Sequence, residues 1–204
     1  MIISDVRITG IEDVERRLGS LKDKAPVAMY RAVNDSVSKS FTETKKAISA
    51  NYHITQKNIA PSLKKLKASR SNLKGAVSAK GERISLYKFK HKGGNPISAA
   101  VKKSNSPKPL DGNPKAFIAV MKNANGGNHN GIFERKGLYK KKRKTTEYGR
   151  RVKINKHNEQ IRELDGPAIP QMMNDKKTME RIKNMASETM QRRLEHHIQR
   201  ILQG

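Results

Sequence analysis

The sequence predicts an α+β protein in which a mixed or antiparallel β-sheet is packed by a long helix in the N-terminal half of the chain. Apolar residues recur at helical spacing along residues 26–50 and again along residues 174–202. Between these two helices, apolar residues alternate with Lys, Ser or Gly, which is the pattern of strands with one wet face. The predicted domain spans residues 1–173 and contains a basic β-arm insertion at residues 136–160. A long C-terminal helix at residues 174–204 then packs on this domain or on a neighbouring subunit.

The N-terminal part begins with a predicted strand over residues 2–8, where β-branched residues roughly alternate with polar ones. A helix is expected over residues 11–21, with acidic side chains in its first turn. Pro26 suits the first turn of the next helix, over residues 26–50. That helix has charged residues on one face and an apolar stripe on the other, so it is expected to lie against a sheet. The stripe consists of Tyr30, Val33, Val37, Phe41 and Ile48.

Short segments follow this helix. Thr55 is expected to cap a short helix that begins directly after it, and Pro61 and Ser62 end this helix or start another turn. The lysine-rich stretch after it predicts several strands whose wet face is cationic. These strands are expected at residues 63–68, 73–79, 84–90 and 97–103, with loops at residues 92–96 and 105–114.

Residues 116–173 form the stretch around which the chain is organised. Core strands are predicted at residues 116–122 and 131–135, joined by a Gly- and Asn-rich loop. A basic excursion follows, and a third strand then turns at Gly166-Pro167 into a short helix. The final helix presents a long apolar stripe, part of which is expected to face another subunit. This stripe consists of Met179, Ile182, Ala186, Met190, Leu194, Ile198 and Ile201.

Composition limits the classes of function. The chain has 204 residues, a formal net charge of +26 and no cysteine, which excludes disulfides, zinc–thiolate sites and thiol nucleophiles. Residues 64–160 carry 26 Lys and Arg against 5 Asp and Glu, so the centre of the chain holds most of the charge. A charge of this size favours polyanionic partners. Neither a membrane span nor a signal peptide is recognised, so a soluble compartment and no membrane partner are expected.

A catalytic or metal-binding constellation is not found in the sequence, and neither enzymatic activity nor a cofactor is expected. His196 and His197 are adjacent, so on a helix they point about 100° apart and do not form a metal-binding pair. Asn128-His129-Asn130 superficially resembles part of an HNH nuclease motif, but a flexible Gly/Asn loop is the favoured interpretation. Glu163 and Asp165 lie beside Arg162, where a structural ion pair is expected.

The basic arm is the candidate binding site. Residues 136–156 contain ten Lys or Arg against the single Glu147. Such a segment binds DNA phosphates or an acidic protein surface without reading sequence, or it is a solvated loop that aids solubility. Few aromatic residues interleave it, which argues against base stacking. The candidate contact residues are Lys140, Lys141, Lys142, Arg143, Lys144, Arg150, Arg151 and Lys153.

Three segments resemble the phage minor tail protein Z family. They are an F-I-A-x-M segment at residues 117–121, a G-[IV]-F-x-R segment at residues 131–135, and an I-R-E-L-x-G-P-x-[IV]-P-Q-M segment at residues 161–172. Residues 136–160 look longer and more basic than the family's usual connection. The matched residues, called signature residues below, are Phe117, Met121, Gly131, Phe133, Arg135, Ile161, Arg162, Glu163, Leu164, Gly166, Pro167, Pro170, Gln171 and Met172.

The resemblance implies a structural virion protein of the tail or neck, without enzymatic activity. Such tail-completion proteins act at the head-proximal end of the tail and are assembled in the host cytoplasm. The implied partners are copies of the same chain in a ring, six being expected, together with the tail terminator, the tail tube and the head-closure or connector proteins. Packaged double-stranded DNA is a further expected partner. The alternatives are a non-sequence-specific DNA-binding accessory protein and a nuclease.

Overall fold

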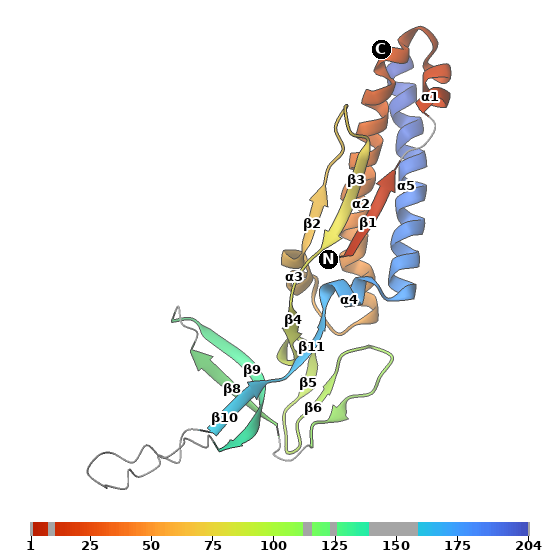
Figure 1. The fold of residues 1–204 in the computed structure, drawn as a ribbon. Helices are drawn as coiled ribbons and strands as arrows, with labels where there is room; N and C mark the ends of the chain where they lie inside the picture. The colour runs from red at the N-terminus through yellow and green to blue at the C-terminus, as the bar shows by residue number, and fades with distance from the viewer. Residues whose placement is uncertain (1, 8–10, 112–115, 123–125, 139–158, 204) are drawn as a thin grey trace, which may run out of the picture. The chain divides into compact units, whose positions relative to one another are not determined.

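The computed structural model confirms the α+β class, and it divides the chain into two compact units (Figure 1). Unit 1 comprises Met1–Ile84 and Pro167–Gly204, and unit 2 comprises Ser85–Gly166. Unit 1 is therefore built from both ends of the chain, and unit 2 is inserted between them. The structure describes residues 2–7, 11–111, 116–122, 126–138 and 159–203.

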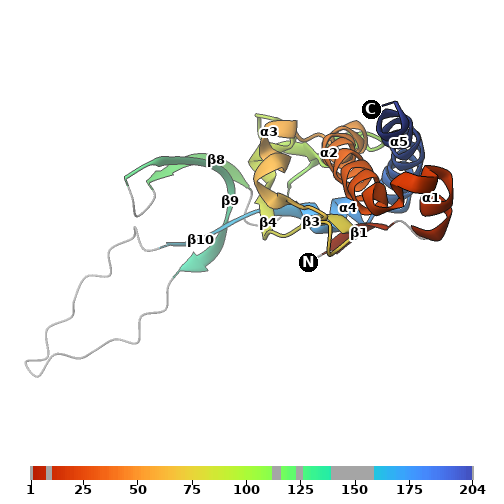
Figure 2. The same ribbon diagram turned by 90° about the horizontal axis from the view of Figure 1, so that it is seen from above.

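Unit 1 is dominated by two long helices, α2 (Ala25–Asn51) and α5 (Lys176–Leu202), which run side by side (Figures 1 and 2). Both helices were predicted from their apolar stripes and are confirmed. The first predicted helix is shorter than expected, because α1 (Ile11–Leu18) ends in a 3-10 helix, Gly19–Lys24. Two core clusters line these helices: Val33, Val37, Ala68, Val77 and Ala186 in one, and Val14, Leu18, Ala25, Ala28, Met29 and Ile198 in the other.

Small side chains allow α2 and α5 to approach closely. Ala32, Ser36 and Ser40 are all buried on α2. The Ser36 hydroxyl donates a hydrogen bond of 2.8 Å to the carbonyl oxygen of Ala186 on α5. Nearer the end of α2, the Asn51 amide donates to the Thr178 hydroxyl at 2.9 Å. The contact between the helices is therefore fixed by polar bonds as well as by apolar packing.

A three-stranded antiparallel sheet, in the order β1-β3-β2, covers α2. Its strands are β1 (Ile2–Arg7), β2 (Leu63–Leu66) and β3 (Lys74–Ala79). A Cβ atom on Gly75 would lie 2.6 Å from Val33 and 2.7 Å from Val37, so only glycine permits this contact with α2. The wet face predicted for β3 is wrong. Residues 75–79 are all buried, because β3 is the central strand and its outward residues Ala76 and Ser78 are small.

Two short helices complete unit 1. Thr55 precedes α3 (Gln56–Ile59) in an extended conformation, as expected for an N-cap. However, its side chain makes no capping hydrogen bond, so the predicted cap is wrong in that respect. The second helix, α4 (Ile169–Met173), follows the predicted Gly-Pro turn.

Unit 2 contains small antiparallel sheets rather than one large sheet. One sheet has the order β10-β9-β8, and its strands are β8 (Phe117–Lys122), β9 (Asn128–Leu138) and β10 (Glu159–Glu163). A second sheet contains β5 (Lys90–Lys92), β6 (Ser98–Ala100) and β7 (Lys108–Pro109). A two-stranded sheet pairs β4 (Arg83–Ser85) with β11 (Asp165–Ala168), and the boundary between the units falls within both strands.

Several sequence predictions differ from the structure in unit 2, and the strand predicted over residues 97–103 is reduced to Ser98–Ala100. The strand predicted over residues 84–90 is interrupted by a 3-10 helix, Leu86–Lys88. The loop predicted over residues 105–114 contains the two-residue strand β7. The Gly- and Asn-rich loop is shorter than expected, because Asn128, His129 and Asn130 belong to β9. Among the described residues, every helix is too short or too polar to cross a membrane.

Candidate functional site

The predicted polyanion-contact residues, Lys140 to Lys144, Arg150, Arg151 and Lys153, lie outside the described residues. The structure does describe the strands on either side of them. β9 ends at Leu138 and β10 begins at Glu159, and these two residues are paired in the antiparallel register. The arm therefore connects two adjacent strands of the β10-β9-β8 sheet, and the predicted strand at residues 131–135 extends into its base.

The register of this sheet gathers the signature residues onto one face. Phe117 pairs with Phe133, and Glu163 pairs with Phe133 from the other side. Directly opposed residues of an antiparallel sheet lie on the same face, as do residues two apart in one strand. The resulting signature face consists of Phe117, Ala119, Met121, His129, Gly131, Phe133, Arg135, Ile161 and Glu163. All of these except Ala119 and His129 were predicted as signature residues.

An aromatic pair with a cation above it lies on this face. The rings of Phe117 and Phe133 have centroids 6.1 Å apart, within the usual range for aromatic pairs. The guanidinium carbon of Arg135 lies 4.7 Å from the Phe117 ring centroid. Such a cation–π contact contributes about 0.5–1 kcal/mol at an exposed site. The Arg135 side chain, at the end of the G-I-F-E-R segment, is therefore held over the ring of Phe117, the first residue of the F-I-A-V-M segment.

A second contact on the signature face joins β9 to β10. His129 Nε2 lies 2.7 Å from Glu163 Oε1. A Cβ atom on Gly131 would lie 2.7 Å from both Glu163 Oε1 and the Phe133 ring, so this glycine leaves room for the pair. The sequence prediction of a flexible loop missed His129. The signal that could have found it is its two-residue spacing from Gly131 and Phe133, which continues the alternation of the predicted strand.

The opposite face carries a different ion pair. Arg162 lies 2.7 Å from Glu134 across the β9–β10 ladder. The sequence prediction paired Arg162 with its neighbours Glu163 and Asp165, whereas Glu163 bonds His129 on the other face. Side chains adjacent in a strand point to opposite faces. Arg162 therefore pairs with Glu134 on the neighbouring strand and not with the adjacent Glu163.

The middle of the long signature segment is fixed by backbone contacts within unit 2. The Leu164 amide donates to the Ile132 carbonyl at 2.8 Å, and the Leu164 carbonyl accepts from the Leu86 amide at 2.8 Å. A Cβ atom on Gly166 would lie 2.6 Å from the Phe89 ring. Close packing against Phe89 therefore explains the glycine, and the two backbone bonds fix the position of residue 164.

The end of the same segment belongs to unit 1. Pro167 lies in β11, and Pro170 occupies the first turn of α4, where a missing amide proton has no cost. The Gln171 side-chain oxygen accepts a bond of 3.0 Å from the Ala168 amide, so it caps the helix start. Met172 is fully buried. The signature thus divides between the units, with Gly166 the last residue in unit 2.

The described signature residues mainly pack, pair or cap. A histidine held by a carboxylate is also the arrangement that orients a general base, but that use requires a nucleophile or substrate beside the imidazole. A Cβ atom on Gly131 would meet Glu163 Oε1 and the Phe133 ring, so the carboxylate of the pair lies beside a glycine and a phenylalanine. Groups of three or more His, Cys, Asp or Glu with metal-site geometry are not present among the described residues. The described contacts of this face are packing and pairing contacts within the β10-β9-β8 sheet, two of whose strands are joined by the basic arm.

Comparisons with protein-family models, with curated proteins and with solved structures found no match to this chain.

Proposed function

We propose that this chain is a structural protein of a phage virion, a tail-completion component at the head-proximal end of the tail. In this role several copies, six being expected, form a ring that joins the tail to the head and lets DNA pass. The ring would contact the tail terminator, the tail tube and the head-closure or connector proteins.

The observation that carries the proposal is the set of three signature segments in family order. Two structural features support it. The first two segments and the start of the third occupy the neighbouring strands β8, β9 and β10, and alternate residues of the three segments share one face. Their glycines, Gly131 and Gly166, lie where any larger residue would overlap a neighbouring side chain. Residues with such packing roles suit a structural protein.

The charge supports contact with a polyanion. Unit 2 contains 20 Lys and Arg against 6 Asp and Glu, and half of those cations lie in residues 136–156. On this proposal the arm from Lys140 to Lys156 reaches packaged DNA in the channel or the acidic wall of a neighbouring ring. Either partner removes the self-repulsion that this charge density imposes on the free chain.

Electron microscopy of particles assembled without this chain tests the proposal. The expected result is filled heads with normal DNA content that fail to join tails. Infectious particles with intact necks would contradict it. A second candidate, a free DNA-binding accessory protein, is favoured by the charge alone, and predicts normal joining with altered DNA content.

The arm gives a narrower test. Replacing Lys140 to Lys144 by Ser should leave the helical circular dichroism unchanged but lower the yield of joined particles, because the described strands end before these lysines. Replacing Lys22 and Lys24 in the 3-10 helix by Ser provides an exposed cationic control in unit 1. Unchanged titres of the arm variant would refute the assigned role of the arm.

A further inference from the structure

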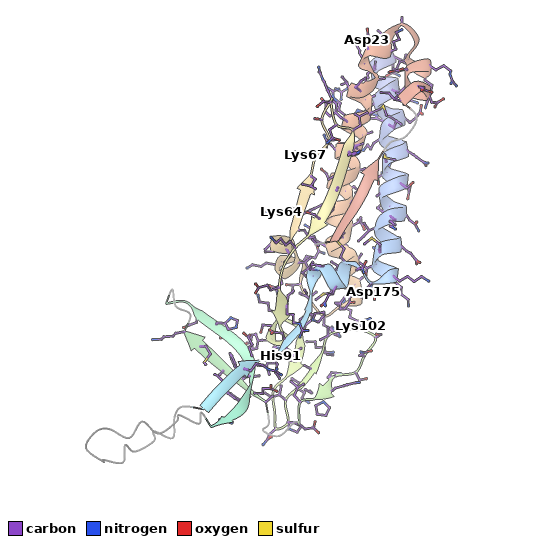
Figure 3. The ribbon with its side chains drawn as sticks, viewed as in Figure 1. Asp23, Lys64, Lys67, His91, Lys102 and Asp175 are labelled. Carbon is purple, nitrogen blue, oxygen red and sulfur yellow. The ribbon has the colours of Figure 1, made fainter. Side chains whose placement is uncertain are left out.

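Unit 1 contains a second cationic feature, the hairpin formed by β2, β3 and their connecting turn. This basic hairpin, residues 63–79, has five Lys or Arg and no Asp or Glu. Figure 3 shows two of these residues, Lys64 and Lys67, along the outer edge of β2. Lys64, Lys65 and Lys67 are all exposed. The hairpin is therefore a positively charged edge of the β1-β3-β2 sheet.

The tip of the basic hairpin is rigidly held. The Ser69 amide donates to the Asn72 carbonyl at 2.8 Å, and the Asn72 amide returns a bond of 3.3 Å to the Ser69 carbonyl. The Asn34 side chain on α2 donates to the Ala68 carbonyl at 3.1 Å and accepts from the Ala68 amide at 2.8 Å. These bonds close the turn that contains Arg70 and tie the base of that turn to α2. A preorganised cation loses less entropy on binding than one on a free loop.

Helix α2 adds cations to the same edge through two aromatic residues. The Lys45 and Lys65 ammonium groups lie 5.1 and 4.7 Å from the Phe41 ring centroid. Arg31 and Arg70 both interact with the Tyr30 hydroxyl, and the hydrogen bond from Arg31 is the main cause that lowers the pKa of Tyr30.

Tyr30 and Phe41 are eleven residues apart, so they lie on one side of α2 about 16 Å apart along its axis. Together these contacts define a cationic ridge that runs along the seam between α2 and the hairpin. It comprises Arg31, Lys45, Lys65 and Arg70, together with the exposed Lys67, which lies between Lys65 and Arg70 in the hairpin sequence.

The acidic residues of α2 form their ion pairs elsewhere. Asp35 lies 3.1 Å from His197 and 3.7 Å from Arg193, both on α5. Glu43, whose side chain is only 6% exposed, lies 3.6 Å from Arg181 on α5 and 3.2 Å from Lys46. The two carboxylates of α2 are therefore paired, mainly with residues of α5, whereas the contacts described above for the cations beside the hairpin are with aromatic side chains.

We propose that this cationic ridge binds the phosphate backbone of duplex DNA. Each strand of a duplex presents a phosphate about every 3.4 Å along the axis, so the ridge faces about five phosphates of one strand. An acidic protein fits less well, because protein interfaces centre on apolar residues and are depleted of charge there, whereas this seam presents mainly cations. The inference does not rest on the proposed virion role, and it places DNA contact in unit 1 rather than on the arm.

The test measures binding of the full-length chain to a short fluorescent duplex of mixed sequence over a range of salt concentrations. The ridge variant Lys65→Gln/Lys67→Gln/Arg70→Gln is compared with Lys176→Gln/Lys177→Gln/Lys183→Gln, which removes the same charge from exposed positions on α5. The ridge variant should bind about tenfold or more weakly, and its salt slope should fall by about 3. The control should keep the wild-type slope.

A second variant keeps the test decisive if the first one unfolds. Arg31→Gln/Lys45→Gln changes only α2 and should lower the slope by about 2. Equal slopes in the ridge and control variants would overturn the inference. So would complete loss of duplex binding on replacing Lys140 to Lys144, or equal competition by polyglutamate of the same charge. A finished particle whose neck does not contain the chain would contradict the proposed virion role but would leave the inference about the cationic ridge unaffected.

Discussion

The two units of this chain are stabilised in different ways. Of the twelve largest fully buried side chains among the described residues, eleven belong to unit 1 and only Ile132 belongs to unit 2. Unit 2 also exposes Ile118 and Val120 on β8, at 40% and 60% of their surface. Apolar burial is the dominant favourable term in folding, so unit 1 has the larger reserve of stability. Unit 2 relies instead on tight glycine contacts and cross-strand pairs.

This difference bears on where neighbouring components would stabilise the chain in the proposed virion. Small sheets with few buried side chains are marginal by themselves. Unit 2 also carries the basic arm and most of the signature residues. In the proposed virion, unit 2 is therefore the part that contacts with neighbouring components are expected to stabilise most. Unit 1 is stabilised by the packing of its own helices.

The largest expected effect is in the core of unit 1. Ile182 on α5 is fully buried, so Ile182→Ala should lower the free energy of unfolding by about 2–5 kcal/mol. Denaturant titration followed by circular dichroism reports this unit, because both long helices belong to it. Leu202→Ala is the matched control, since Leu202 is 53% exposed on the same helix and should change little. Equal effects of the two substitutions would mean that α5 is not packed as described.

A smaller and local effect is expected in unit 2. The added methyl group in Gly131→Ala would overlap Glu163 and Phe133, at a cost of about 1–3 kcal/mol. Hydrogen exchange should show faster exchange in β8, β9 and β10, with protection in α2 and α5 unchanged. Gly93→Ala is the control, because a Cβ atom there meets nothing within 4 Å. If α2 and α5 lost protection too, the two units would not be energetically separate.

The smallest effect is expected at the surface pair of unit 2. Arg162 and Glu134 have side chains 56% and 29% exposed, so Arg162→Ala should cost at most about 1 kcal/mol. A double-mutant cycle with Glu134→Ala isolates the pair, and its coupling energy should shrink as salt is added. A coupling that stays constant at high salt would show that the pair is shielded from solvent, against the exposure seen here.

The two long helices were predictable because the helical period of their apolar stripes can be recognised within each segment. It does not depend on which other element the helix packs against. Val33, Val37 and Ile48 are buried as the pattern on α2 implied. The strands were harder, since burial depends on position within a sheet. The alternation in β3 indicated a wet face, but a central strand flanked by β1 and β2 buries small residues on both sides.

The candidate site could be predicted only in part. The three signature segments were placed on strands and a short helix, but the cross-strand register was not readable from spacing. His129 and Glu163 are 34 residues apart in sequence, and only the pairing of β9 with β10 brings them together. The division of residues 161–172 between the two units could not be predicted either. Gly166 and Pro167 are adjacent in the chain, and nothing in the sequence marks a boundary between them.

The most direct test of the proposed function is a reconstruction of the particle neck at side-chain resolution, combined with quantification of this chain in purified virions. The proposal predicts a fixed number of copies in a ring at the head-proximal end of the tail, with unit 2 and its basic arm held by neighbouring components. A stable lone monomer that is absent from finished particles would contradict it.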